Sequence, residues 1–265
     1  HIVDYSEIPV FDAMVTGCSY VFRNSFVKNN KIKISKIKEK LTYFIEQNLF
    51  LEIPNNMFRI ELTEVSSKII TKMKKNMNKV EDFCYVSMGA EVHSKENEKE
   101  KSRKEERISD KQINKDYKPF LEGLDIDKYI IKGVNKYVEY IPELMRRPKF
   151  PELFENEKLL VRNVTGKNGI IATIDKSNYY VDCTINCCVL GNKLKGVKQR
   201  VLQRKDFVNK VFEDINLSTL LAVLNAKSTN YYFLKYLGDN LHVNPNDIKN
   251  LPIPKMDEKV KNYLA

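Results

Sequence analysis

The sequence predicts an α+β fold, because its β-type and helical segments are largely segregated along the chain. Short runs that alternate apolar and polar residues, separated by turn residues, dominate up to Leu190. A long helical pattern follows in residues 208–238. Strands followed by helices favour small sheets backed by C-terminal helices over an alternating parallel sheet.

The N-terminal part predicts a β-hairpin followed by mixed elements. Residues 1–26 read as two strands and their connection, and residues 28–37 continue with a basic β-type alternation. Residues 41–52 place Leu41, Phe44, Ile45 and Leu49 at helical spacing. A short strand is expected at 57–62, and then an amphipathic helix over 63–80 with Thr63 or Ser66 as its N-cap.

The remaining elements are mostly strands until the C-terminal helices. A strand with a turn at Gly89 leads into residues 95–111, which are almost entirely charged but nearly neutral in sum. The segment 158–190 predicts three strands, with Asn168-Gly169 as a hairpin signal. Asn216 or Ser218 is the expected cap of the helix that runs through Leu220, Leu221 and Leu224.

The composition points to an anionic partner. The chain of 265 residues carries a formal charge of +10, and residues 193–205 contain positive residues and no acid. Such a run fits a polyanion such as nucleic acid, or a solvated helix face. The longest apolar runs are far too short to cross a bilayer, so no membrane partner is expected.

No motif for a reaction is visible. The sequence lacks a dinucleotide-binding glycine loop and a Walker phosphate loop, and its cysteines and histidines do not have metal-ligand spacing. Five cysteines are expected to stay reduced. Asp125 and Asp127 could share one face of a strand, but an Asp there also caps turns. Binding chemistry is better represented, because aromatic and positive residues alternate in several loops.

Four segments in order resemble the C-terminal part of adenine-specific DNA methyltransferases of the TaqI-like type, including large fused restriction–modification enzymes. They are "IVDYSEIPVFDAMVTGCSYVFRN", "YKPFLEGLDIDKY", "RRPKFPELFENEKLLVRNVTG" and "LLAVLNAKSTNYYF" with "IKNLPIPK". Glu122 and Lys128 depart from the basic residue and the arginine that are frequent in the family.

The resemblance implies a division of the chain. Residues 1–26 would be the terminal hairpin of the methyltransferase domain, residues 27–80 a connecting strand and helices, and residues 81–265 the target-recognition domain with a charged insertion at 95–111. The catalytic Pro-Pro-Tyr loop and the S-adenosylmethionine site are absent, so this part alone would be inactive and would hold no cofactor. The parent protein would be a cytoplasmic bacterial or archaeal enzyme.

The expected function is therefore recognition of a specific sequence in double-stranded DNA, next to an upstream methyltransferase domain that methylates adenine on N6. Arginine and lysine can bind phosphates, and arginine and asparagine can read base edges. The candidate DNA-binding residues are Lys118, Lys128, Tyr129, Arg146, Arg147, Arg162, Asn163, Lys167, Asn168, Lys195, Lys198, Arg200 and Arg204.

Two other functions fit the same residues. The chain could be an interaction module that docks other subunits through its C-terminal helices. It could also bind RNA through the same basic and aromatic loops.

Overall fold

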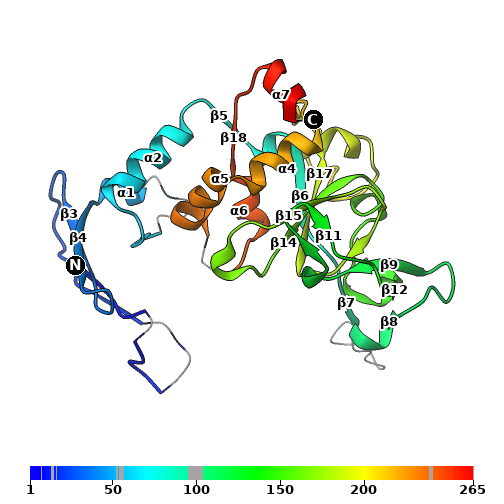
Figure 1. Cartoon of the computed structure of the whole chain (residues 1–265), viewed down its shortest axis with the longest axis horizontal. Coiled ribbons are helices and arrows are strands. Elements are labelled where there is room, and N and C mark those ends of the chain that lie inside the picture. Colours follow the sequence, from blue (N-terminus) through cyan, green and yellow to red (C-terminus); the bar gives the residue numbers. More distant parts are fainter. Residues whose placement is uncertain are drawn as a thin grey trace. The chain divides into compact units, whose positions relative to one another are not determined.

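The computed structural model describes residues 1–6, 8–12, 15, 17–51, 53, 57–94, 104–238 and 241–264. The chain forms two compact units (Figure 1). Unit 1 consists of His1–Lys75 with Lys235–Leu237, and unit 2 consists of Asn76–Leu234 with Gly238–Ala265. The α+β class is confirmed, because both units combine small sheets with helices.

Unit 1 contains a four-stranded sheet in the order β2-β1-β3-β4. Its strands are β1 (Ile2–Asp4), β2 (Cys18–Tyr20), β3 (Lys31–Lys36) and β4 (Leu41–Glu46). The antiparallel pairing of β1 with β2 confirms the N-terminal hairpin. Strand β1 also pairs in parallel with β3, so the hairpin forms one sheet with the residues that follow it.

The helix expected from Leu41 onward is wrong, since Leu41–Glu46 forms β4 and pairs antiparallel with β3 over its whole length. Lys40 adopts a left-handed φ of 50° and turns the chain back on itself. Thr42, Tyr43 and Ile45 favour a strand, and cross-strand pairing outweighs the coincidental helical spacing of the apolar residues. Helix is confined to the short α1 (Asn48–Leu51).

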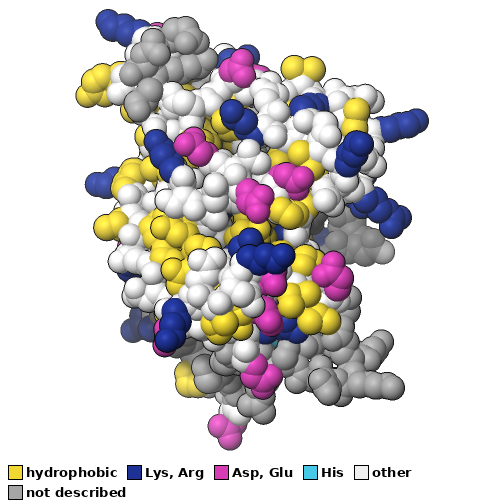
Figure 2. Space-filling view, turned by 90° about the vertical axis from the view of Figure 1, so that its right-hand side faces the viewer, with side chains coloured by type: hydrophobic (Ala, Val, Ile, Leu, Met, Phe, Trp, Pro, Cys, Tyr) yellow, Lys and Arg dark blue, Asp and Glu magenta, His cyan; other side chains and the backbone are white. Residues whose placement is uncertain are grey.

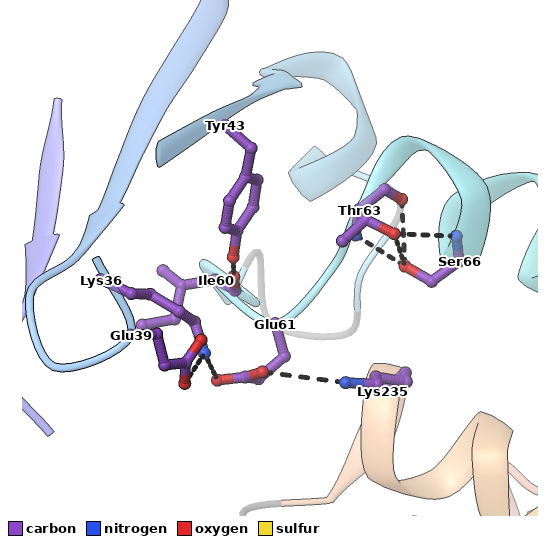
Figure 3. A network of polar contacts seen from close by, with 8 residues as sticks. All are labelled: Lys36, Glu39, Tyr43, Ile60, Glu61, Thr63, Ser66 and Lys235. Carbon is purple, nitrogen blue, oxygen red and sulfur yellow. Dashed lines mark hydrogen bonds and ion pairs between the residues drawn. The ribbon is translucent and has the colours of Figure 1, made fainter. Parts of the chain in front are cut away.

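The strand expected at 57–62 is also wrong, because these residues form an irregular loop held by side chains (Figure 3). Lys36 Nζ lies 2.6 Å from a Glu61 carboxylate oxygen, and the Tyr43 hydroxyl donates to the Ile60 carbonyl. The loop leads into α2 (Glu64–Lys74). There the Thr63 hydroxyl accepts from Ser66 N–H at 3.2 Å, which confirms Thr63 as the N-cap.

Unit 2 is built around an antiparallel sheet in the order β15-β14-β17-β6. The strands are β6 (Cys84–Met88), β14 (Lys158–Arg162), β15 (Ala172–Asp175) and β17 (Ile185–Leu190). Strands β14 and β17 are buried along almost their whole length, so both of their faces are covered. This sheet confirms the first two of the three strands expected between residues 158 and 190. The third is divided into β16 (Tyr180–Val181), which joins another sheet, and β17.

A second, mixed sheet in unit 2 has the order β16-β9-β12-β8. It consists of β8 (Ile108–Ser109), β9 (Tyr117–Leu121), β12 (Tyr137–Glu139) and β16 (Tyr180–Val181). Phe120 from this sheet and Phe154 are almost fully buried in the core, whereas Phe150 is only partly buried. Of the charged segment 95–111, residues 95–103 lie outside the described residues, and the rest packs as a short helical turn and β8.

Two-stranded ribbons complete the β-structure of unit 2. They are β10 (Ile126–Asp127) with β11 (Ile130–Ile131), β7 (Glu91–Ser94) with β13 (Met145–Arg147), and β5 (Met77–Lys79) with β18 (Pro252–Pro254). Short 3₁₀ turns join the strands: η2 (Val80–Asp82), η3 (Lys104–Arg107), η4 (Gly123–Asp125), η5 (Pro142–Leu144), η6 (Pro151–Leu153), η7 (Gly166–Asn168) and η8 (Gly191–Leu194).

Among the C-terminal helices, α4 contacts β14 and β15 of the central sheet (Figure 1). The helices are α3 (Lys205–Val208), α4 (Leu217–Asn225), α5 (Lys227–Tyr232), η9 (Phe233–Leu237, a π-turn), α6 (Pro245–Lys249) and α7 (Glu258–Leu264). The side chain of Asn216 accepts from Thr219 N–H at 2.6 Å, which confirms it as the cap of α4. Within the described residues, no helix has the length and apolarity needed to span a bilayer.

All five cysteines are free, as expected. Cys84, Cys187 and Cys188 are buried in the central sheet, and burial raises the pKa of the Cys84 and Cys187 thiols to about 12. These thiols therefore act as small apolar side chains rather than nucleophiles. The described residues contain no group of three or more His, Cys, Asp or Glu side chains arranged to hold a metal ion.

A fully buried ion pair fixes the start of β14. Lys158 Nζ donates to Asp175 Oδ2 and to the Phe154 carbonyl, and both charged side chains have no exposed surface. Asp175 also accepts from the backbone N–H groups of Ser177 at 2.7 Å and Tyr179 at 2.9 Å. The pair thus joins two turns to the end of the central sheet.

Removal of one partner is expected to leave the other charge buried without compensation. Asp175→Leu should lower the free energy of unfolding by about 3–5 kcal/mol, as measured by urea denaturation. The double variant Lys158→Met with Asp175→Leu should be more stable than the Asp175→Leu variant, because no buried charge remains. A double variant that loses the sum of the two single losses would contradict this account.

Candidate nucleic-acid interface

The turn between β10 and β11 presents Lys128 and Tyr129 to solvent. Tyr129 is 59% exposed and has a left-handed φ of 68°, a conformation that costs energy for a bulky residue. Its N–H donates to the carbonyl of Ala172 in β15 at 2.9 Å. This hydrogen bond attaches the turn to the edge of the central sheet.

The connection from β14 to β15 carries Arg162, Lys167 and Asn168. Lys167 and Asn168 are exposed in the 3₁₀ turn η7, and Arg162 is half-buried at the end of β14. Gly169 ends the turn with φ 69°, and a Cβ there would overlap the side-chain oxygen of Asn230. The hairpin predicted from Asn168-Gly169 is confirmed, because β14 and β15 are antiparallel neighbours.

These two connections lie together although more than thirty residues of sequence separate Tyr129 from Arg162. The Tyr129–Ala172 hydrogen bond joins them, and the charge of Arg162 acts on Asp127 at the start of the other turn. Five of the candidate residues therefore share one region, called here the two-loop surface: Lys128, Tyr129, Arg162, Lys167 and Asn168.

One acidic group stands within this surface. The backbone N–H of Lys128, the Lys132 ammonium 3.4 Å away and the Arg162 guanidinium lower the pKa of the Asp127 carboxyl. Asp127 is thus ionised at neutral pH, and its negative charge opposes the positive charges around it. The negative charge of Asp127 weakens binding to any polyanion, and it also restricts which polyanions match the charges of this surface.

Asn163 is not on the surface, which removes it from the exposed candidates. It is 6% exposed, its N–H donates to the Thr184 carbonyl at 2.8 Å, and its own carbonyl accepts from Val243 N–H at 2.7 Å. Its side-chain oxygen has no donor among the described residues. Asn163 is therefore packed inside unit 2, whereas the preceding Arg162 is only half-buried.

Arg146 and Arg147 lie on a different ribbon, where they pair with an acid. Both arginines of β13 approach Glu91 of β7, with nitrogen–oxygen distances of 3.7 and 2.7 Å. Lys118 lies half-buried on β9. These three residues lie on β9 and β13, whereas the two-loop surface is formed by the β10–β11 and β14–β15 connections, so they are not counted with it.

The basic segment 193–205 divides into structural and exposed residues. Lys195 Nζ donates to the carbonyls of Phe207, Val208 and Lys210 at 2.6–3.1 Å and lies over the rings of Phe207 and Phe212. Its donors are used in holding the end of α3, so Lys195 is a structural residue.

The other basic residues of this segment differ from Lys195. Lys198 and Arg200 are exposed and make no hydrogen bond or ion pair with any residue that the structure describes. Arg204 is also exposed, and its charge acts on the nearby Tyr85 hydroxyl. These three side chains can reach an external phosphate without breaking an internal ion pair.

Figure 2 shows one face of the molecule, on which lysine and arginine side chains are interspersed with aspartate and glutamate side chains. Sequence-specific contacts on such a face depend on particular side chains at fixed positions.

Sequence reasoning missed two residues that support this region, the buried Asn225 and the half-buried Asn230. Asn225 and Asn230, in the segment "LNAKSTN", hydrogen-bond to Ala172 and Ile170 beside the two-loop surface. Their sequence spacing is only a weak signal, because asparagine is common at helix ends and their partners lie more than fifty residues away.

A rigid α+β scaffold that presents arginine, lysine, asparagine and tyrosine on loops is the organisation of a domain that recognises nucleic acid. Residues 118–253 match the model of the TaqI-like C-terminal specificity domain, and the chain belongs to this family. The family is one of DNA-recognition domains in methyltransferase and restriction systems. The search of curated proteins found no match.

We expect Asp127→Asn to strengthen binding to duplex DNA of any sequence, because it removes a negative charge and releases Lys132. The gain should be severalfold at low salt and should shrink as salt is added, since the groups involved are exposed. Fluorescence anisotropy with a labelled duplex over a KCl series measures it. Asp110→Asn, which removes an exposed acid elsewhere, is the control, and an equal gain in both variants would contradict a local effect.

Proposed function

We propose that this chain recognises a specific sequence in double-stranded DNA for an enzyme that methylates adenine on N6. The observation that carries the proposal is the junction of two loops at Ala172, which brings base-reading and phosphate-binding side chains into one region of a fixed scaffold. Membership of the TaqI-like specificity family supports a DNA partner.

Each side chain of the two-loop surface has a chemistry suited to this role. The Arg162 guanidinium can donate two hydrogen bonds to guanine, and the Asn168 carboxamide can pair with adenine. Lys128 and Lys167 can neutralise phosphates, and the exposed ring of Tyr129 can pack on a sugar or a base. Lys198, Arg200 and Arg204 add phosphate contacts, each of which contributes about 0.9 to the salt dependence of binding.

The methyl-transfer chemistry belongs to another part of the enzyme in this proposal. The chain has no glycine-rich strand-to-helix turn that would hold S-adenosylmethionine, so its residues do not fit that cofactor. Unit 1 exposes an unusual run of apolar side chains, including Val21 at 73%, Phe22 at 71% and Phe26 at 92%. Such a surface favours a covering partner, which we infer to be a linked methyltransferase domain.

The proposal is tested by two substitutions with different expected results. Arg162→Ala should reduce the preference for the best duplex by about 1–3 kcal/mol while changing non-specific affinity little. Lys198→Ala should weaken all duplexes alike and lower the salt slope by about 0.9. Binding constants over a salt series with duplex DNA, single-stranded DNA and structured RNA provide the measurement.

A control and two contrary outcomes belong to this test. Lys33→Ala removes an exposed charge from β3 in unit 1 and should leave both quantities unchanged. A preference for RNA would favour an RNA-binding function. The absence of binding to any nucleic acid would favour a protein-docking module.

The adenine specificity is tested on the intact gene product. We expect the polypeptide that includes the residues upstream of this chain to transfer a labelled methyl group from S-adenosylmethionine to adenine in duplex DNA. Mass spectrometry of the digested DNA identifies the modified base. Methylation of cytosine would contradict the proposal, even if sequence-specific binding is observed.

A further inference from the structure

Two asparagines outside the two-loop surface, the buried Asn225 and the half-buried Asn230, hold its backbone through their side-chain amides. Asn225, which is 7% exposed, ends α4, and Asn230 lies on α5. Both side chains hydrogen-bond to the backbone of the β14–β15 connection or of β15 itself. Neither belongs to the surface that would meet DNA.

Asn225 completes the open edge of the central sheet. Strand β15 is an edge strand, and its Ala172 peptide groups are satisfied by the Asn225 carboxamide in place of a neighbouring strand. Ala172 N–H donates to Asn225 Oδ1 at 3.1 Å, and Asn225 Nδ2 donates to the Ala172 carbonyl at 2.9 Å. The same carbonyl accepts from Tyr129 N–H, so one oxygen joins α4, β15 and the β10–β11 turn.

Asn230 joins the turn itself to the helices. Its Oδ1 accepts from Ile170 N–H at 2.6 Å, and its Nδ2 donates to the carbonyls of Leu224 at 3.3 Å and Ala226 at 3.0 Å. Leu224 lies in the last turn of α4, and Ala226 joins α4 to α5, where its carbonyl also accepts the Asn230 N–H. The Asn230 side chain approaches Gly169 so closely that only glycine fits there.

We propose that Asn225 and Asn230 are positioning residues for the reading of DNA sequence, an inference that rests on the proposed function. A side chain discriminates well between bases only if its backbone is already held in the binding geometry. A mobile loop loses conformational entropy on binding, and this cost reduces the free energy gained from every correct contact. The side-chain amides of Asn225 and Asn230 attach both connections of the two-loop surface to α4 and α5. The basic segment 193–205, all of which the structure describes, has no hydrogen bond to either asparagine, so its contribution to non-specific attraction should not depend on them.

The experiment uses Asn225→Ala and Asn230→Ala in the whole chain, with duplexes selected from a randomised DNA pool as probes. We expect the affinity ratio between the best selected duplex and a scrambled duplex to fall about tenfold in each variant. Affinity for the scrambled duplex should change by less than about twofold. Amide hydrogen exchange at Ile170 and Tyr129 should become faster in the absence of DNA.

Two further variants separate positioning from a general loss of stability. Leu220→Ala removes a buried side chain from the same helix α4 and should lower the melting temperature while leaving the affinity ratio unchanged. Asn230→Asp keeps the acceptor for Ile170 N–H but loses both donors, so its ratio should lie between those of the wild type and Asn230→Ala.

The outcomes distinguish this inference from the function on which it rests. Wild-type discrimination that survives in both alanine variants would overturn the positioning role and leave the proposed function intact. An equal loss of discrimination in Leu220→Ala would also overturn it, because the effect would then follow stability. A wild-type chain that does not discriminate between duplexes would refute the proposed function and this inference together.

Discussion

The double-sided burial of β14 is the constraint on which unit 2 depends. The strand lies between β15 and β17 and begins with the buried Lys158, so it cannot shift in register without exposing a charge or breaking two ladders. Fixing one end of the strand also fixes the other. Arg162 therefore leaves the sheet at a defined point, and the connection to β15 begins there.

The parts of the fold with local causes could be predicted from the sequence. The strands between residues 158 and 190 are apolar runs separated by turn signals, and Asn216 and Thr63 are caps with short-range partners. The wrong predictions concern segments whose secondary structure depends on contacts with residues far away in the sequence. Residues 41–46 had helical spacing, but pairing with β3 made them a strand, and the loop at 57–62 is held by Lys36 and Tyr43 rather than by a ladder.

The candidate site shows the same division. Loops with arginine, lysine and asparagine could be recognised from residue type alone, but the use of each side chain could not. The sequence does not distinguish Lys195 from the nearby Lys198, yet the Lys195 ammonium donates hydrogen bonds to three backbone carbonyls. Asn163 looks like Asn168, yet it is buried. Only tertiary contacts reveal that Tyr129, Ala172 and Asn225 meet, since each comes from a different part of the chain.

The left-handed backbone of Tyr129 has a physical explanation in the same contacts. An unfavourable φ in a bulky residue persists only when the surroundings hold it, and here the N–H of Tyr129 is bound to a carbonyl that a buried asparagine already orients. An aromatic ring on such a turn has few alternative positions. The same holds for the turn at Gly169, which packs against Asn230 without room for a side chain. A surface of mixed charge on firmly held loops is better suited to distinguishing similar polyanions than to attracting all of them. The reason is that the loops cannot move to accommodate a partner that fits poorly.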